Sequence, residues 1–297
     1  MFFWIGLAVF AQLINALSVI IDKYLLNSEN GVRDPVVYTF YVSMLSGIVL
    51  IMAPFGVVSW PGSDTIFLSL MTAAAYIFSI LCLYQSLKIS SASDVVPVAG
   101  AVSAITTFVF AYWFLHQDLP EGFLLAFSFL TAGLFLISGF RFTGKSFSYV
   151  FLAGVFFGAS AFLMKLLFLS ASFADGFFWS RMANVLVALL LLFLPQTYVA
   201  IRNRIKVSPA RTKWLVVGNK AMAGFAFILT LFAINIGSVS VVNSLSGLQF
   251  VFLLPLAYFF HQKMPKSFPG EIEHHRFPHK LVGIISIIIG FFVLFFK

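Results

Sequence analysis

Three basic side chains lie inside apolar stretches of this sequence and are the residues best placed to do chemistry. Lys165 and Arg181 each stand a few residues inside an apolar run, on either side of the short turn 170–175. Lys220 stands deeper inside a third run, beside Asn219. The rise of a helix puts each of them about 7–10 Å below its helix end. Ionisable groups at such depth are costly and mark functional positions by default.

Two interpretations of these cations remain open. In the first they form a cationic vestibule, because Arg binds carboxylate or phosphate in a bidentate way and Lys acts as a point charge. In the second their stems lie in lipid with the heads at the headgroups, or Lys165 and Arg181 pair with Asp175. Lys220 is deeper and has an amide neighbour, so we expect it to face a cavity. Asp22, late in the first apolar run, is expected to pair locally with Lys23.

Neutral polar residues inside the apolar runs extend the set of candidate ligands. Asn243, Ser246 and Gln249 share one helical face by their i, i+3 and i+6 spacing. The predicted substrate-binding residues are Lys220, Asn219, Asn243, Ser246, Gln249, Asn15, Gln12, Tyr84, Arg181 and Lys165. The wider set adds Asn184, Asn235, Ser244 and Tyr76. The alternative for each neutral residue is a hydrogen bond between helices without a ligand.

The elements that must position these residues are membrane-spanning helices. Of the 297 residues, 61% are hydrophobic and 9% are charged, whereas a soluble domain would carry about 25% charged residues. A helix needs about 20 apolar residues to cross the hydrocarbon layer. The near-continuous apolar runs are typical of such helices and not of alternating membrane strands. Ten spanning helices are predicted, at 2–26, 35–53, 64–88, 94–115, 121–140, 147–170, 176–194, 213–236, 239–260 and 279–296.

The chain also repeats itself once. One apolar helix ends in HQDLP at 116–120, and a later one ends in HQKMP at 261–265. Lys23 and Lys165 fall late in the first helix of each half. We therefore predict a five-helix repeat at 1–140, a linker at 141–146 and a second repeat at 147–297. Because five is an odd number, the repeats must insert with opposite orientation, a device of secondary transporters.

The residues also carry a family resemblance. The order of the helices, the SASDVVP stretch at 91–97 and the polar turns after the fourth and ninth helices resemble the EamA-type drug/metabolite transporter superfamily. The resemblance covers nearly the whole chain. It implies a monomeric or homodimeric metabolite carrier with a central cavity and with the fifth and tenth helices at its periphery. The family usually has a glutamate in those turns. This chain has Gln117 and Gln262 instead, so no carboxylate role is carried over there.

The function predicted from the sequence is secondary transport of one small polar metabolite, anionic or zwitterionic, by alternating access. No catalytic role and no cofactor are expected, and no phosphate-binding glycine loop occurs, so a gradient of a coupling ion or substrate would supply the energy. A metal site at 271–279 is not favoured, because Pro278 spoils the helical spacing of His275 and His279. A lipid flippase, a membrane scaffold and a lipid-modifying enzyme using His116 or His261 remain as alternatives.

The charge distribution bears on partners and orientation. Although the net charge is +8, the basic residues are scattered among loops, so no nucleic-acid partner is predicted. We expect a multi-pass protein of a prokaryotic inner or plasma membrane, surrounded by lipid. Lys and Arg are concentrated in the loops after the odd-numbered helices. Short loops rich in Lys and Arg usually face the cytoplasm. The charge rule therefore predicts both termini outside the cytoplasm, whereas relatives in the superfamily are usually drawn with both inside.

Overall fold

The structure, a computed structural model, describes residues 2–27, 34–116, 119, 121–138, 143–193, 198, 210–263 and 277–296. Its elements are α1 (Phe2–Asn27), α2 (Pro35–Leu45), η1 (Ser46–Phe55), α3 (Ser63–Ile89), α4 (Ala92–Phe110), η2 (Ala111–Leu115), α5 (Phe123–Ser138), α6 (Gly144–Ser170), α7 (Phe173–Leu190), η3 (Leu191–Phe193), α9 (Ala210–Ile236), α10 (Val239–Ser244), η4 (Leu245–Gly247), α11 (Leu248–Lys263) and α12 (Phe277–Phe296). Every regular element in the described ranges is helical.

Polar residues at the helix starts determine where several spans begin. The backbone N–H groups of Val36 and Val37 donate to the Asp34 carboxylate ahead of α2. The Asp175 N–H donates to the Ser172 hydroxyl ahead of α7, at 3.1 Å. Such caps bind N–H groups that have no partner within the helix. The starts of these spans are therefore encoded locally in the sequence.

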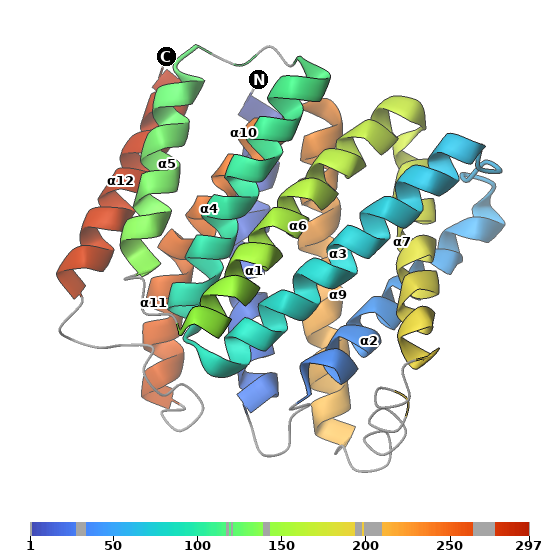
Figure 1. Cartoon of the computed structure of the whole chain (residues 1–297), viewed down its shortest axis with the longest axis horizontal. Helices are drawn as coiled ribbons and strands as arrows, with labels where there is room; N and C mark the ends of the chain where they lie inside the picture. The colour runs from blue at the N-terminus through green and yellow to red at the C-terminus, as the bar shows by residue number, and fades with distance from the viewer. Residues whose placement is uncertain are drawn as a thin grey trace.

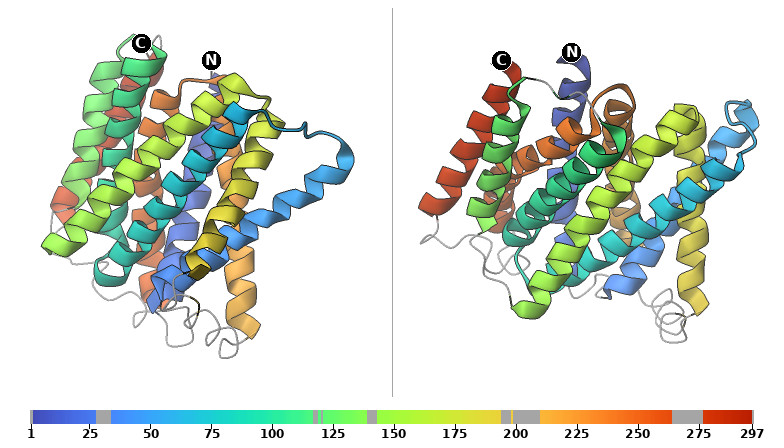
Figure 2. Two further views of the ribbon diagram at one scale, coloured as in Figure 1. Left: turned by 45° about the vertical axis from the view of Figure 1, so that its right-hand side comes forward. Right: turned by 45° about the horizontal axis from the view of Figure 1, so that its top comes forward.

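The helices form one bundle in which the two halves of the chain are interleaved. α5 and α12 lie side by side at one edge, and α4, α6 and α3 cross the front in parallel (Figure 1). α1, α9 and α11 lie behind them, and α2 and α7 occupy the opposite edge (Figure 2). The first half packs on the second through α3 against α6, α1 against α9 and α5 against α12. Both termini lie at the same end of the bundle.

Glycines allow the closest approaches between these helices. A Cβ added at Gly283 in α12 would lie 2.7 Å from the Gly133 carbonyl oxygen in α5. A Cβ added at Gly158 in α6 would lie 2.6 Å from the Ser103 carbonyl oxygen in α4. The Thr107 hydroxyl donates to the buried Gly158 carbonyl at 3.1 Å. Small residues bring transmembrane helices together in this way, as the Gly154-x-x-x-Gly158 spacing predicts.

Composition and exposure identify the solvent of this bundle as lipid. Seven helices in the described residues are long and apolar enough to cross a membrane, and three further apolar helices are shorter. Large apolar side chains cover the outside, for example Phe67 at 63% exposure and Leu190 at 60%. A soluble protein does not expose such contiguous apolar surface. The chain is therefore an all-α, multi-pass membrane protein.

The element bounds follow the predicted helices closely, but three predicted helices change type along their length. The predicted second helix is α2 followed by the 3₁₀ helix η1, and the predicted fourth helix is α4 followed by the π-helix η2. The predicted ninth helix, 239–260, is divided by the 3₁₀ turn η4, so α10 and α11 are separate helices. Residues three apart eclipse in a 3₁₀ turn, and Asn243 and Ser246 both still face α4. The HQ turns lie largely outside the described residues, as do His274 and His275.

Candidate functional site

A buried ion pair connects the first helix of the chain with α9. Lys220 Nζ lies 2.6 Å and 2.7 Å from the two oxygens of the Asp22 carboxylate. Their side chains are 10% and 8% exposed, respectively. α1 belongs to the first half of the chain and α9 to the second. The sequence suggested a local pair with Lys23, whereas tertiary packing gives Asp22 a partner from another span, Lys220.

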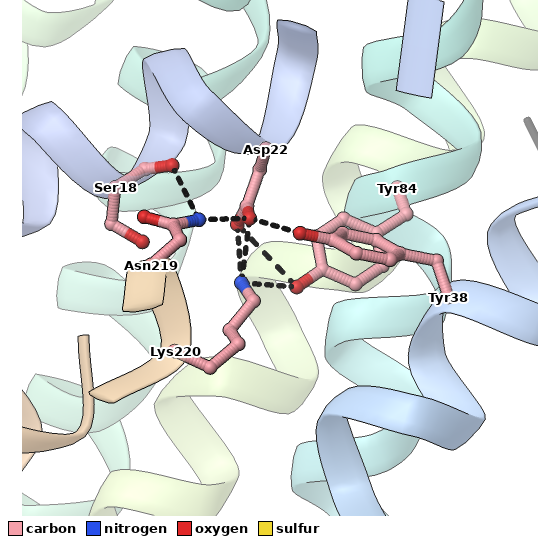
Figure 3. Close-up of polar contacts among 6 residues, drawn as sticks. All are labelled: Ser18, Asp22, Tyr38, Tyr84, Asn219 and Lys220. Carbon is pink, nitrogen blue, oxygen red and sulfur yellow. Dashed lines mark hydrogen bonds and ion pairs between the residues drawn. The ribbon is translucent and has the colours of Figure 1, made fainter. Parts of the chain in front are cut away.

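Three further side chains bind the same carboxylate (Figure 3). Tyr38 Oη of α2 donates at 2.5 Å, and Asn219 Nδ2 of α9 donates at 2.7 Å. Tyr84 Oη of α3 is 3.5 Å from the second oxygen and accepts from Lys220 Nζ at 3.1 Å. We call these five residues the Asp22 cluster. Four helices meet in it, and each contributes a polar group to one negative charge.

The two lysines near the ends of α1 and α6 have a different role. Lys165 Nζ donates to the carbonyl oxygens of Ile234 at 2.9 Å, Asn235 at 3.2 Å and Gly237 at 3.0 Å, around the end of α9. Lys23 Nζ donates to the Ser90 carbonyl oxygen at the end of α3, at 3.2 Å. A cation is stabilising at a helix C-terminus, where carbonyls lack partners. Lys165 is therefore a capping residue, whose ammonium binds helix-end carbonyl groups and not the Asp175 carboxylate.

Replacing Lys165 with methionine should destabilise the protein without removing a ligand contact. The change leaves buried carbonyls at the end of α9 without a donor, which costs about 1–3 kcal/mol. We expect a lower apparent Tm in detergent. Lys145 on the same helix is exposed, so Lys145→Met is the matched control and should leave the Tm unchanged. Equal Tm values for the two variants would contradict the capping role.

Arg181 is the second candidate feature, and no ion pair of its guanidinium is present in the described part of the chain. Its guanidinium lies between two rings, with Cζ 4.5 Å from the centroid of Phe227 in α9 and 5.2 Å from that of Tyr76 in α3. The side chain is only 6% exposed. Among the described residues, its Nε and Nη2 atoms have no hydrogen-bond partner. The alternative that Arg181 pairs with Asp175 is not supported, because that carboxylate accepts from Ser59 N and the Ser172 hydroxyl.

Asn184 adds unsatisfied polar atoms one helical turn along α7 from Arg181. Its side chain is completely buried, and neither Oδ1 nor Nδ2 finds a partner within the described residues. Buried polar groups in native proteins are nearly always hydrogen-bonded, so each exception needs a reason. A bound polar molecule or ordered water supplies one. We call Arg181, Asn184, Tyr76 and Phe227 the Arg181 site.

The Asp22 cluster and the Arg181 site lie along the same two helices. Tyr76 and Tyr84 are both on α3 and fall on one face by their i, i+8 spacing, about 12 Å apart along the axis. Lys220 and Phe227 are both on α9, about 10 Å apart along its axis. Tyr76 stands at the midpoint of α3, between Ser63 and Ile89. The Arg181 site is therefore at mid-depth, and the Asp22 cluster lies two turns nearer the end of α3.

The remaining predicted ligands divide between helix packing and burial. Asn243 Nδ2 donates to the hydroxyls of Ser103 and Thr107 on α4, which is the interhelical alternative. The Ser246 hydroxyl of η4 faces Gly100 of α4 and is buried without a partner in the described structure. Gln12 and Gln249 are buried and Asn15 is half-buried. Lys220, Asn219 and Tyr84 are the predicted ligands that come together.

Sequence reasoning missed two members of the Asp22 cluster. Asp22 is an ionisable residue in an apolar run, and that signal was available, but its neighbour Lys23 offered a simpler partner. Tyr38 carries no sequence signal, since tyrosine is common in membrane helices. The pairing across 198 positions, from Asp22 to Lys220, depends on the packing of α1 against α9.

A surface pocket of about 350 Å³ lies away from both features. Its lining includes Trp60, Asp64, Thr65, Ser170 and Asp175. Thr65 stands near the start of α3, about 16 Å along the helix from Tyr76. The pocket is therefore at the opposite end of α3 from the Asp22 cluster, and its charged lining groups are carboxylates.

Comparison with known proteins adds information on the fold alone. No protein-family model and no curated protein matches this chain. A solved structure described only as "Crystal structure of protein" aligns with a TM-score of 0.64 over 96% of this chain and 97% of that one, at 16% identity. The two proteins share a fold. The function must then be argued from the Asp22 cluster and the Arg181 site.

Proposed function

We propose that this chain is a secondary transporter that carries a small anionic or zwitterionic metabolite, with Arg181 as the residue that binds the negative group. The observation that carries the proposal is the buried guanidinium of Arg181, whose Nε and Nη2 lack partners in the described structure. An uncompensated buried charge is expensive in a membrane protein and persists where function requires it. A carboxylate or phosphate would complete its hydrogen bonds in a bidentate way.

The position of Arg181 supports transport over binding at one surface. α7 and α9 belong to the second half of the chain, and α3 belongs to the first. A ligand on Arg181, beside Tyr76 and Phe227, therefore sits between the halves at mid-depth, as in transporters built from repeats. Rocking of one half against the other would expose that ligand to each side in turn. We assign no role in phosphate-bond hydrolysis, since the sequence has no Gly-rich phosphate loop.

The same arrangement supports ten spans in two inverted repeats. Lys23 binds the end of the third helix of its half, and Lys165 binds the end of the third helix of the other. α3 packs on α6 just as α1 packs on α9, and α5 pairs with α12. We infer a pseudo-twofold relation in the membrane plane, with membership in the EamA-type drug/metabolite transporters as the accompanying proposal. The lipid-modifying enzyme is not favoured, since His116 is exposed.

A screen of purified protein in proteoliposomes tests this function. Each of a library of labelled carboxylates, phosphates, amines and neutral sugars is offered in counterflow, with the unlabelled compound inside. We expect accumulation of members that carry a carboxylate or phosphate, and none for compounds with only a positive charge. Accumulation confined to amines, or no counterflow with any soluble compound, would overturn the proposal. Movement of a fluorescent phospholipid between leaflets would favour the flippase instead.

A further inference from the structure

The Asp22 cluster lies near one end of the helix bundle. Asp22 is near the end of α1, Tyr38 near the start of α2 and Tyr84 near the end of α3, while Lys220 is in the first half of α9. All four therefore approach the end of the bundle opposite the chain termini (Figure 1). We propose that this cluster is a proton-operated gate. Binding of a proton to the Asp22 carboxylate ends its ion pair with Lys220 and opens this end of the protein.

The hydrogen bonds around Asp22 depend on its negative charge, because its neighbours are donors. As a carboxylate, Asp22 only accepts hydrogen bonds, and it receives them from Lys220, Asn219 and Tyr38. A protonated carboxyl becomes a donor and loses acceptor capacity. It then competes with groups that themselves donate. One proton therefore weakens the contacts that the Asp22 carboxylate makes with α2 and α9 at this end.

Lys220 provides the force that opens the gate. With Asp22 protonated, the Lys220 ammonium is a buried cation without a counter-charge, at 10% exposure. Removal of one partner from a buried pair costs several kcal/mol, because the remaining charge is uncompensated. Water reaching Lys220 removes that cost, and water can reach it only if the helices separate. Protonation and opening are thus thermodynamically linked, and each favours the other.

The titratable groups that face Asp22 come from each neighbouring helix. α9 contributes Lys220, α2 contributes Tyr38 and α3 contributes Tyr84. Lys23 follows Asp22 on α1, but its ammonium donates to the Ser90 carbonyl at the end of α3. The Lys220 ammonium is the cation that directly pairs with the Asp22 carboxylate. Its release is the direct consequence of protonation.

The matching positions at the other end of the bundle lack such a pair. Because Lys23 and Lys165 occupy the same place in their halves, Met164 corresponds to Asp22. Because α3 and α9 end alike, Ala73 corresponds to Lys220. Met164 and Ala73 are apolar and buried, and the nearby contact between α6 and α3 is the Ser160 hydroxyl to the Thr72 carbonyl, at 3.4 Å. The positions that match the Asp22–Lys220 pair therefore hold no titratable side chain at the counterpart end.

The gate gives the transport cycle a coupling ion. This step rests on the proposed function, since it needs an anionic cargo. On α9, Lys220 lies two turns from Phe227, which contacts Arg181. Opening frees the Lys220 ammonium, which then attracts an anion toward the mid-depth site. The proton on Asp22 and the anion on Arg181 then move in the same direction. The cargo and the proton would enter together as symport.

Cysteine labelling without any substrate tests the gate separately from the cargo. In a Cys82→Ala background, Ala223→Cys places a thiol one turn from Lys220 toward mid-depth, and an impermeant thiol reagent is applied to each face of sealed vesicles in turn. The reactivity of any thiol falls as the pH is lowered, because a smaller fraction of it is thiolate. Lys213→Cys, exposed at the start of α9, therefore provides the reference rate. The measured quantity is the ratio of the two labelling rates from the face where α9 begins.

We expect this ratio to rise as the pH is lowered in the protein with Asp22. Asp22→Asn, an uncharged mimic of the protonated acid, should be labelled on the order of tenfold faster at every pH, within the ~5–150-fold range of coupled sites. Adding Lys220→Met removes the uncompensated cation. This double variant should be labelled slowly, with a rate ratio that does not depend on pH. The apparent Tm of Asp22→Asn itself shows whether that variant is folded. Slow labelling of Asp22→Asn, or fast labelling of the double variant, would overturn the gate, while counterflow could still succeed.

Discussion

Substitution of Arg181 by methionine should abolish binding of the anionic substrate while leaving the protein at least as thermally stable as before. Two charge-assisted hydrogen bonds of about 1.5–3 kcal/mol each are lost, which weakens affinity by at least about 100-fold. Stability should not fall, because an apolar residue in place of a buried unpaired cation is neutral or favourable. Ligand-dependent shifts in apparent Tm, measured for both proteins, give affinity and stability in one experiment.

Two variants separate the charge of Arg181 from its shape. Arg181→Lys keeps a cation but loses the planar pair of donors, so we expect it to bind more weakly than the wild type and more tightly than Arg181→Met. Tyr76→Phe keeps the ring beside the guanidinium and should preserve most of the affinity. A large fall in the Tm of Arg181→Met would instead make Arg181 a structural residue, because its positive charge would then be compensated within the fold.

Substitution of Lys220 by methionine should produce the largest loss of stability. Asp22 would remain as a buried carboxylate with hydrogen-bond donors but no cation, and breaking a buried pair in this way costs about 3–5 kcal/mol. The double variant Asp22→Asn with Lys220→Met should recover most of that loss, since neither charge remains. Apparent Tm values of the wild type, both single variants and the double variant form a double-mutant cycle. Additive losses would show that the two side chains do not interact.

The spans of this protein were predictable because each depends on a local property. Near-continuous apolar runs identified the helices, and the breaks at Asp34 and Ser172 are capping residues whose effect is felt within one turn. Division of α10 from α11 at Leu245–Gly247 was not predictable in this way. The run remains apolar there, and no proline or charge marks the change.

The candidate site was predictable in its residues and not in its pairings. Depth within an apolar run singled out Lys165, Arg181 and Lys220, because a buried charge is unusual wherever it occurs. The partners of these three side chains differ because of tertiary structure alone. Lys165 meets the end of α9, Lys220 meets Asp22, and Arg181 meets two aromatic rings. No spacing in the sequence distinguishes these outcomes, since each partner comes from another span.

The central claim is that Arg181 binds a transported anion between the two halves, and substrate counterflow tests it most directly. Wild-type protein and Arg181→Met are reconstituted at equal density, and uptake of a labelled anion into vesicles loaded with the same unlabelled anion is followed. The account predicts saturable accumulation for the wild type and none above protein-free vesicles for Arg181→Met. Equal accumulation by the two proteins would contradict it, because the anion would then cross without contacting the guanidinium.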